Sequence, residues 1–374
     1  MMLIDPEAGR VLDDEEIKSD LASRQPYGQW LFDNMVCIDD LPEKTSTLQS
    51  FNAATLLEQQ QIFGYTSEEI RMILQPMAQA GAEAIGSMGT DTPLAVLSDK
   101  PQLMFNYFKQ LFAQVSNPPL DAIREEIVTS LEMPLGAERN VLDESAEQCQ
   151  QLRLYHPVIT NDELERIRHI DHSNIHATTV PSLFNVTGET GSMNDAVHRI
   201  CVEAAEAVQA GYSIVILSDR GANNELAPIP SLLATSAVHH HLIRQGLRTR
   251  CGLVIETGDA RDVMHFALLI GYGAGAVNPY LAYETIDHIT QQGLIQSVDS
   301  TLAKENFVKA IEKGLLKIAS KMGISTLQSY RGAQIFEAVG LNQETVDSFF
   351  TWTPSRIGGV GILAIEAEAR QRHA

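Results

Sequence analysis

The chain has 374 residues, of which 44% are hydrophobic and 20% are charged, a balance typical of a soluble globular protein with a sizeable core. Its 48 acidic and 27 basic residues give a formal charge of −21, which would repel phosphate backbones and anionic lipid surfaces. The composition therefore disfavours nucleic-acid and membrane partners. The length predicts two to three structural units. Residues 1–21 are acidic and do not resemble a signal peptide, so we expect a cytoplasmic protein.

The four cysteines lie far apart, at Cys37, Cys149, Cys201 and Cys251. This spacing fits neither a disulfide framework nor a clustered zinc or iron-sulfur site. Incidental or buried thiols are therefore expected.

The first third of the chain divides into an arm and a helical part. Residues 1–45 are expected to form an arm, because few apolar periodicities persist there. In residues 46–135, Thr66 to Glu69 opens a helix that Pro76 is expected to kink. The local patterns predict a strand over 93–97, a helix over 102–115 from the spacing of phenylalanine and tyrosine, and a helix over 121–131.

The remainder alternates apolar runs with helical patterns. We expect an irregular connection over 136–190, with one helix over 162–170, and a flexible exit segment over 351–374. Between them, residues 191–350 repeat a strand, a loop and a helix. The strands are predicted at 213–217, 252–256 and 274–278, and a fourth unit over 323–339 is predicted to end in a helix at 333–339. The sequence therefore predicts an α/β protein with a mainly parallel sheet, open or part of a barrel, preceded by a helical segment.

The loops after the four predicted strands contain the candidate site residues. The carboxyl ends of parallel strands meet at one edge of a sheet, so these loops are expected to converge. Opposite charges stand together at Asp219 and Arg220 and again at Asp259 and Arg261. Ion pairs that fix each loop explain these residues, and an anion held at the next helix N-terminus is the functional alternative.

The sequence contains no self-sufficient catalytic motif. The glycines of 271–275 follow a predicted helix and enter a strand, which is the wrong order for a dinucleotide loop. The segment 355–361 lacks the lysine of a phosphate loop, and no serine lies in a nucleophile elbow. The three histidines of 239–241 cannot face one metal ion, because successive helical residues point about 100° apart.

Several segments, in order along nearly the whole chain, resemble the central domain of glutamate synthase. They include Met-Gly-Thr-Asp-Thr at 88–92, Val-Ser-Asn-Pro-Pro at 115–119, Leu-Ser-Asp-Arg at 217–220, Glu-Thr-Gly-Asp-Ala-Arg at 256–261 and Leu-Gln-Ser-Tyr-Arg-Gly at 327–332. In that family the central domain lies between a glutamine amidotransferase domain and an FMN-binding domain. The resemblance implies that residues 1–45 leave the amidotransferase domain and that 351–374 lead toward the FMN domain.

The resemblance also implies a role. Glutamine is hydrolysed in the amidotransferase domain, and ammonia passes through an internal tunnel to the FMN site, where 2-oxoglutarate becomes L-glutamate. The positions that match the central-domain tunnel wall are Met88, Thr90, Ser116 and Asn117. Thr90 stands where asparagine is frequent in the family, Ser116 where threonine is frequent, and Trp352 where glycine is frequent.

We therefore expect a scaffold and channel domain with no catalytic residue, no metal and no cofactor of its own. FMN and a three-iron cluster are expected in the parent enzyme, together with ferredoxin or a pyridine-nucleotide-dependent subunit as partner. A plastid stroma is the expected location if the parent is plastidial. The alternative is an autonomous α/β enzyme or a small-anion-binding protein that uses Arg220, Arg261 and Arg331.

Overall fold

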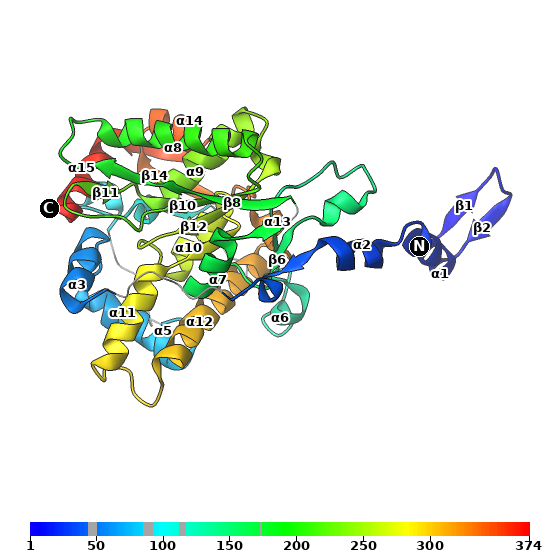
Figure 1. Ribbon diagram of the computed structural model, residues 1–374, viewed down its shortest axis with the longest axis horizontal. Coiled ribbons are helices and arrows are strands. Elements are labelled where there is room, and N and C mark those ends of the chain that lie inside the picture. The colour runs from blue at the N-terminus through cyan, green and yellow to red at the C-terminus, as the bar shows by residue number, and fades with distance from the viewer. Residues whose placement is uncertain (44–50, 85–92, 112–116, 173) are drawn as a thin grey trace.

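The computed structural model describes residues 1–43, 51–84, 93–111, 117–172 and 174–374 (Figure 1). Its centre is a sheet in which four strands run parallel, in the order in which they occur along the chain, with a short antiparallel strand outside the first. These strands are β8 (Ile175–Pro181), β10 (Ile214–Ser218), β12 (Gly252–Glu256) and β13 (Ala276–Asn278), with β7 (Asp171–His172) beside β8. The predicted α/β class and parallel sheet are confirmed.

The middle strands, β10 and β12, are buried along their whole length. Parallel strands covered on both faces appear in a sequence as continuous apolar runs, which is why the sequence predicted them well. Figure 1 shows α8 and α9 on one side of the sheet and α7, α11 and α12 on the other. The helices around the sheet are α7 (Asn161–Arg168), α8 (Ser192–Gln209), α9 (Ser231–Arg244), α10 (Val263–Gly271), α11 (Tyr280–Gln291) and α12 (Ser300–Lys321).

The region 136–190 is not the irregular connection that the sequence suggested, because it contains β8. Ile214 of β10 pairs with Ala177 of β8, so this strand belongs to the central sheet. Its middle carries threonines that are only partly buried, and an apolar run is therefore missing. Residues 157–159 also join the sheet, since Val158 pairs with Val277 of β13 in parallel.

A second sheet corrects three other expectations, and a fourth is corrected by a segment beside it. It consists of β4 (Phe108–Gln110), β14 (Phe336–Leu341) and β15 (Ser355–Val360), with β14 in the middle. The predicted helices over 102–115 and 333–339 are wrong, because β4 and β14 occupy those segments. The exit segment is likewise a strand, β15, followed by helix α15 (Ile362–His373). The strand predicted over 93–97 is instead a 3₁₀ turn, Ala95–Leu97.

Aromatic packing explains the error over 102–115. Phe108 lies 4.9 Å from Phe350 and 5.5 Å from Tyr272, measured between ring centroids. Phe105 stacks on His265 at 4.1 Å. Rings buried by distant parts of the chain produced a spacing that imitates a helix.

The helical part before the sheet begins with α3 (Ala53–Ile62) and continues in one irregular rod. The rod consists of α4 (Ser67–Glu69), a π-helical turn (Ile70–Leu74) and α5 (Gln75–Ala80). Thr66 and Glu69 form the expected capping box. The kink at Pro76 stays a prediction; just before it the rod is π-helical, because the N–H of Gln75 bonds to the carbonyl of Ile70, five residues back. The next helix, α6 (Glu125–Val128), is shorter than the predicted 121–131.

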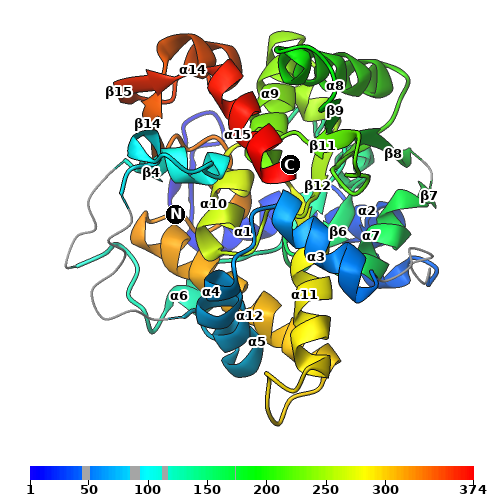
Figure 2. The same ribbon diagram turned by 90° about the vertical axis from the view of Figure 1, so that its left-hand side faces the viewer.

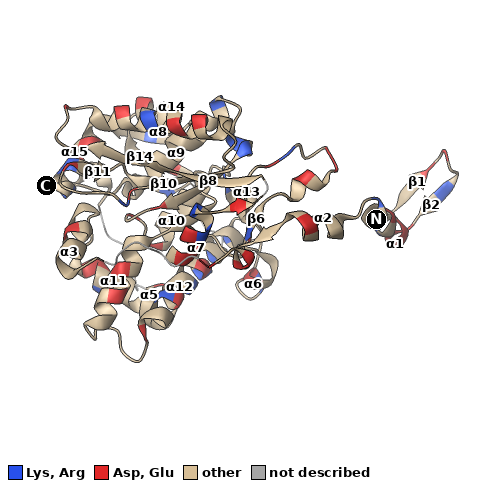
Figure 3. Cartoon of the chain, in the orientation of Figure 1, with Lys and Arg blue, Asp and Glu red and all other residues tan. Residues whose placement is uncertain are grey.

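The N-terminal arm projects away from the body (Figure 1). Its helices α1 and α2 contain no buried residue. The arm consists of β1 (Leu3–Asp5), β2 (Arg10–Leu12), α1 (Asp14–Ser23) and α2 (Tyr27–Asn34). Acidic segments are spread over the arm, α3, α8 and α11 rather than gathered on one element (Figure 3). Among the described helices, none is long and apolar enough to cross a membrane.

The last helix, α15, packs against the body of the protein and is hydrogen-bonded to it. The buried carboxylate of Glu366 accepts bonds from the backbone N–H groups of Gly191 and Met193 at the start of α8, at 2.9 and 3.3 Å. Figure 2 shows α15 crossing beside β11 (Leu226–Pro228), which it contacts. The remaining elements are β3 (Val36–Cys37), β5 (Met133–Leu135), β6 (Leu152–Leu154), β9 (Leu183–Asn185), α13 (Leu327–Tyr330) and α14 (Gln343–Phe349).

Candidate functional site

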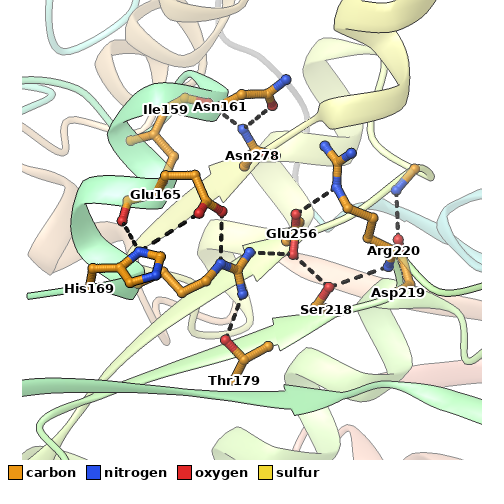
Figure 4. A network of polar contacts seen from close by, with 12 residues as sticks. Ile159, Asn161, Glu165, His169, Thr179, Ser218, Asp219, Arg220, Glu256 and Asn278 are labelled. Atoms are coloured by element: carbon orange, nitrogen blue, oxygen red, sulfur yellow. Dashed lines mark hydrogen bonds and ion pairs between the residues drawn. The ribbon is translucent and has the colours of Figure 1, made fainter. Parts of the chain in front are cut away.

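The carboxyl ends of β10, β12 and β13 meet in a buried polar network, which we call the carboxyl-edge network (Figure 4). Its centre is the carboxylate of Glu256, the last residue of β12, which is 1% exposed. One carboxylate oxygen accepts from Ser218 at 2.6 Å and from Arg168 at 2.8 Å, and the other accepts from Arg220 at 2.8 Å. Two guanidinium groups thus share one buried carboxylate.

Arg168 brings α7 into this network. It donates to Glu165 at 2.9 Å and to Thr179 of β8 at 2.6 Å, in addition to Glu256. Burial works against the charged guanidinium, but Glu256 and Glu165 together raise the pKa of Arg168. The guanidinium of Arg220 also lies over the ring of Tyr280, at 4.2 Å from its centroid.

Asp219 is the second buried carboxylate of this edge. It accepts from the Thr257 hydroxyl at 2.6 Å and from the Gly258 N–H at 3.0 Å. Burial, together with the neighbouring Asp259, raises the pKa of Asp219 well above its ordinary value, although both hydrogen bonds oppose the shift. Asp259 in turn accepts from the N–H of Ser231 at 2.9 Å, where α9 begins.

Arg261 joins the loop after β12 to the helical part of the chain. Its guanidinium is 2% exposed, donates to the carbonyls of Phe63 and Gly64 at 3.2 and 2.9 Å, and pairs with Glu69 at 3.1 Å. A Cβ on Gly258 would lie 2.7 Å from the Phe63 ring, so a glycine is needed where the loop meets α3. Arg261 therefore holds the segment between α3 and α4 against the sheet.

The predicted ion pairs of Asp219 with Arg220 and of Asp259 with Arg261 are wrong, because among the described residues each arginine has another partner. Arg220 pairs with Glu256 rather than Asp219, and Arg261 pairs with Glu69 rather than Asp259. Glu256 was a visible signal, because it ends an apolar strand with a charge. The contacts of Arg168 and Glu69 could not be found from sequence, because each joins the network from a distant segment.

Arg331 does not join the other loops, so the predicted convergence of four loops is wrong. It pairs with Glu138 at 3.0 Å, and the N–H of Glu138 bonds to Thr249, which precedes β12. Arg331 therefore lies at the amino edge of the sheet, opposite Arg220. The reason is that the segment before it forms no strand of the central sheet.

The histidine run lies at the same amino edge, on α9. His239 Nδ1 accepts from Arg248 Nε at 2.8 Å, and burial with the Arg248 charge lowers the pKa of His239 to about 2. Burial lowers the pKa of His240 to about 4. The two rings are turned 82° to one another. Among the described residues there is no grouping of three His, Cys, Asp or Glu side chains able to hold a metal ion.

Comparison with known proteins places this sequence in a family. The family model described as "Glutamate synthase central domain" matches residues 58–342. The chain belongs to this family. It is 46% identical over 374 residues to the glutamate synthase [NADPH] large chain of Bacillus subtilis, and this match covers 100% of the chain and 24% of that protein.

Relatives of other kinds match at similar identity. The ferredoxin-dependent glutamate synthase 2 of Synechocystis is 42% identical over 389 residues, covering 100% of the chain and 24% of that protein. The glutamate synthase [NADH] of Schizosaccharomyces pombe is 42% identical over 388 residues, covering 100% of the chain and 18% of that protein. The central domain thus spans a quarter or less of these relatives. A flavocytochrome b2 mutant aligns at a TM-score of 0.29 with 15% identity, over 37% of this chain and 32% of that one, a likeness too slight to support a conclusion.

The tunnel positions predicted for the central domain lie mostly outside the described residues. This holds for Met88, Thr90 and Ser116, whereas Asn117 is described and is exposed. The described flanks of the two segments nevertheless meet the same two elements. On one side, Glu83 pairs with Lys317 of α12 at 3.5 Å, and Pro119 packs on Gly323, just after α12.

On the other side, both segments reach β14. Val96 packs against Gly340, where an added Cβ would lie 2.4 Å from Val96. The N–H of Leu111 bonds to the carbonyl of Ile335, just before β14, at 2.9 Å. The described residues on either side of positions 85–92 and of positions 112–116 therefore contact the end of α12 at one flank and the region of β14 at the other.

Proposed function

We propose that this central domain is a non-catalytic scaffold of a glutamate synthase and that it lines part of the passage for ammonia between two active sites. Similarity over the whole chain to large-chain relatives supports membership in such an enzyme. The carboxylate of Glu256 is bound by Ser218, Arg168 and Arg220, which supports a structural role for the site that the fold would otherwise offer to a ligand. Glu256, Arg220 and Arg261 all bind groups of the protein itself.

The proposed parent reaction assigns chemistry to both neighbours. Glutamine is hydrolysed in the amidotransferase domain, and the released ammonia condenses with 2-oxoglutarate to give 2-iminoglutarate. Bound FMN supplies the reducing equivalents that convert the imine to L-glutamate. In this proposal FMN and the three-iron cluster belong to polypeptide outside this chain. The electron donor is either ferredoxin or a pyridine-nucleotide-dependent subunit, and relatives named for each kind match equally well.

One observation carries the passage: the described flanks of the Met88 and Ser116 segments contact the same two elements, α12 and β14. Two segments that bridge the same pair of elements are well placed to border one channel. Met88, Thr90, Ser116 and Asn117 are its proposed lining residues. A tunnel keeps ammonia from protonation and loss to solvent, so a narrow lining has a direct effect on coupling.

The test is made in the full-length enzyme with Met88→Trp. We expect hydrolysis of glutamine to continue while glutamate formation from glutamine falls about tenfold or more, because the bulky ring obstructs the passage. Glutamate formation from added ammonium should be retained. The matched control is Met72→Trp, since Met72 is 64% exposed on the π-helical turn. Equal loss of both activities, in a folded enzyme, would contradict the passage.

The scaffold role has its own readout. The purified chain should contain no flavin after incubation with FMN and gel filtration. A stoichiometric flavin absorbance would assign a cofactor to this domain and would contradict the non-catalytic scaffold role. The proposed ammonia passage would not be affected by that result.

A further inference from the structure

A pocket of about 330 Å³ opens at the amino edge of the sheet, opposite the carboxyl-edge network. It lies between the second half of α9, the end of α10 and the turn before β15. We call it the amino-edge pocket. Its wall includes His240, Arg244, Tyr272, Gln334, Phe336 and Trp352. Its volume falls at the lower end of the range of small-molecule sites, and its lining combines aromatic rings with few polar groups, as such sites do.

Backbone strain is concentrated on this wall. In the described chain, three residues other than glycine have a positive φ, namely Gln334 (56°), Trp352 (68°) and Ser297 (63°). The first two line the pocket. A left-handed backbone costs a large side chain roughly 1–2 kcal/mol. Trp352 is 80% exposed, so burial of its ring does not offset this cost. Strain of this kind often marks a ligand site, because a ligand can supply the missing contacts.

A cation without an ionic partner stands beside Trp352. Among the ion pairs of the described residues, none involves Arg244. Its guanidinium makes two long bonds of 3.5 Å, to Thr351 Oγ1 and to the Ser348 carbonyl. Its N–H groups therefore keep most of their capacity for an anion, in a protein whose net charge of −21 otherwise disfavours anions.

We propose that the amino-edge pocket binds a flat aromatic carboxylate, with the ring against Trp352 and the carboxylate on Arg244. The exposed indole offers a stacking face, Tyr272 and Phe336 form an apolar floor, and Arg244 supplies two donors for one carboxylate. The ring and the charge are both required, because neither an aromatic alcohol nor an aliphatic acid satisfies the whole wall. The ammonia passage does not rest on ligand binding in this pocket, so failure of this site would leave that proposal untouched.

The chain offers a clean reporter, because it contains two tryptophans, Trp30 on the arm and Trp352 in the pocket. Trp30→Phe protein labelled with 5-fluorotryptophan has a single fluorine resonance. We expect 1-naphthoate to shift this resonance saturably. Its uncharged analogue 1-naphthalenemethanol and the non-aromatic cyclohexanecarboxylate should each bind about tenfold more weakly.

A second variant separates specific binding from loose contact with an exposed ring. Arg244→Gln should weaken naphthoate about tenfold and leave naphthalenemethanol unchanged. Arg124→Gln is the matched control, because the Arg124 side chain is 75% exposed and far from the pocket. The proposal is overturned if naphthoate gives no saturable shift at millimolar concentration, or if Arg244→Gln binds naphthoate as tightly as the starting protein does.

Discussion

The two edges of the central sheet differ in how they use polar residues. At the carboxyl edge, Glu256 and Asp219 are almost fully buried, and both accept hydrogen bonds from neighbouring groups. At the amino edge, His239 and His240 are held neutral, and Arg244 has no carboxylate partner within the described part of the chain. Parallel α/β sheets commonly place ligands at the carboxyl edge, but here the buried carboxylates of that edge are bound by the protein's own side chains. The amino edge instead leaves donors of Arg244 available in a pocket.

This difference implies that the carboxyl edge contributes more to stability. Glu256→Gln should lower the free energy of unfolding by about 3–5 kcal/mol, because it leaves Arg220 without its buried ion-pair partner and Arg168 with only Glu165. Urea unfolding followed by circular dichroism measures the change. Glu203→Gln is the control: this glutamate pairs with Arg199 at the surface and should cost less than about 1 kcal/mol. Equal, small effects would mean that the network is not a structural centre.

The two edges should also respond to pH in opposite directions. Asp219 has a raised pKa in the folded state, so its contribution to stability is present below its unfolded pKa and is lost as the pH rises. Asp219→Asn should therefore gain stability relative to the native chain as the pH rises above about 4. His240 has a pKa lowered to about 4, so the unfolded chain takes up a proton first and stability is lost as the pH falls below about 6.5.

His240→Gln should remove that acid loss, an effect on the order of 2 kcal/mol at pH 4. Unfolding midpoints of both variants across this range give the comparison. If Asp219→Asn and His240→Gln change the dependence of stability on pH in the same direction, the inference that the two edges respond to pH in opposite directions is refuted.

The smallest expected effect concerns Trp352. Trp352→Gly should raise the free energy of unfolding by about 1 kcal/mol, because glycine adopts a positive φ without strain. Trp352→Ala removes the same ring but keeps the strain, so the difference between the two variants isolates the backbone. If the alanine and glycine variants are equally stable, the backbone at position 352 relaxes freely and its positive φ costs no stability.

Much of the central sheet could be predicted from sequence because its strands are local signals. The runs around Val215 and Val254 are apolar up to their last residue, and α8 and α9 beside them have helical periodicity. The strands β4 and β14 were missed for the opposite reason. Their residues are defined by partners far along the chain, as when Phe336 pairs with Gln110. A short segment with mixed burial fits a helix and a strand equally well.

The candidate site shows the same division. Asp219, Arg220, Asp259 and Arg261 could be placed at strand ends, because the strands themselves were visible. Their partners could not be predicted, since the pairs of Arg261 with Glu69 and of Arg220 with Glu256 depend on packing between separate elements. Arg331 was misplaced because the loop that carries it was assigned to a strand-loop-helix unit that does not form.

The π-helical turn between α4 and α5 gives one rod two different orientations. Such a turn holds an extra residue, so the side chains beyond it are rotated about the helix axis relative to those before it. Before the turn, Glu69 pairs with Arg261 in the loop that follows β12. After the turn, Met77 and Ala78 are buried where α5 packs on α12. A regular helix of the same length would have to give up one of these partners. Removing a single residue here would therefore rotate the second half of the rod about the helix axis. The side chains of α5 would then turn away from α12, although the sequence of α5 would be unchanged.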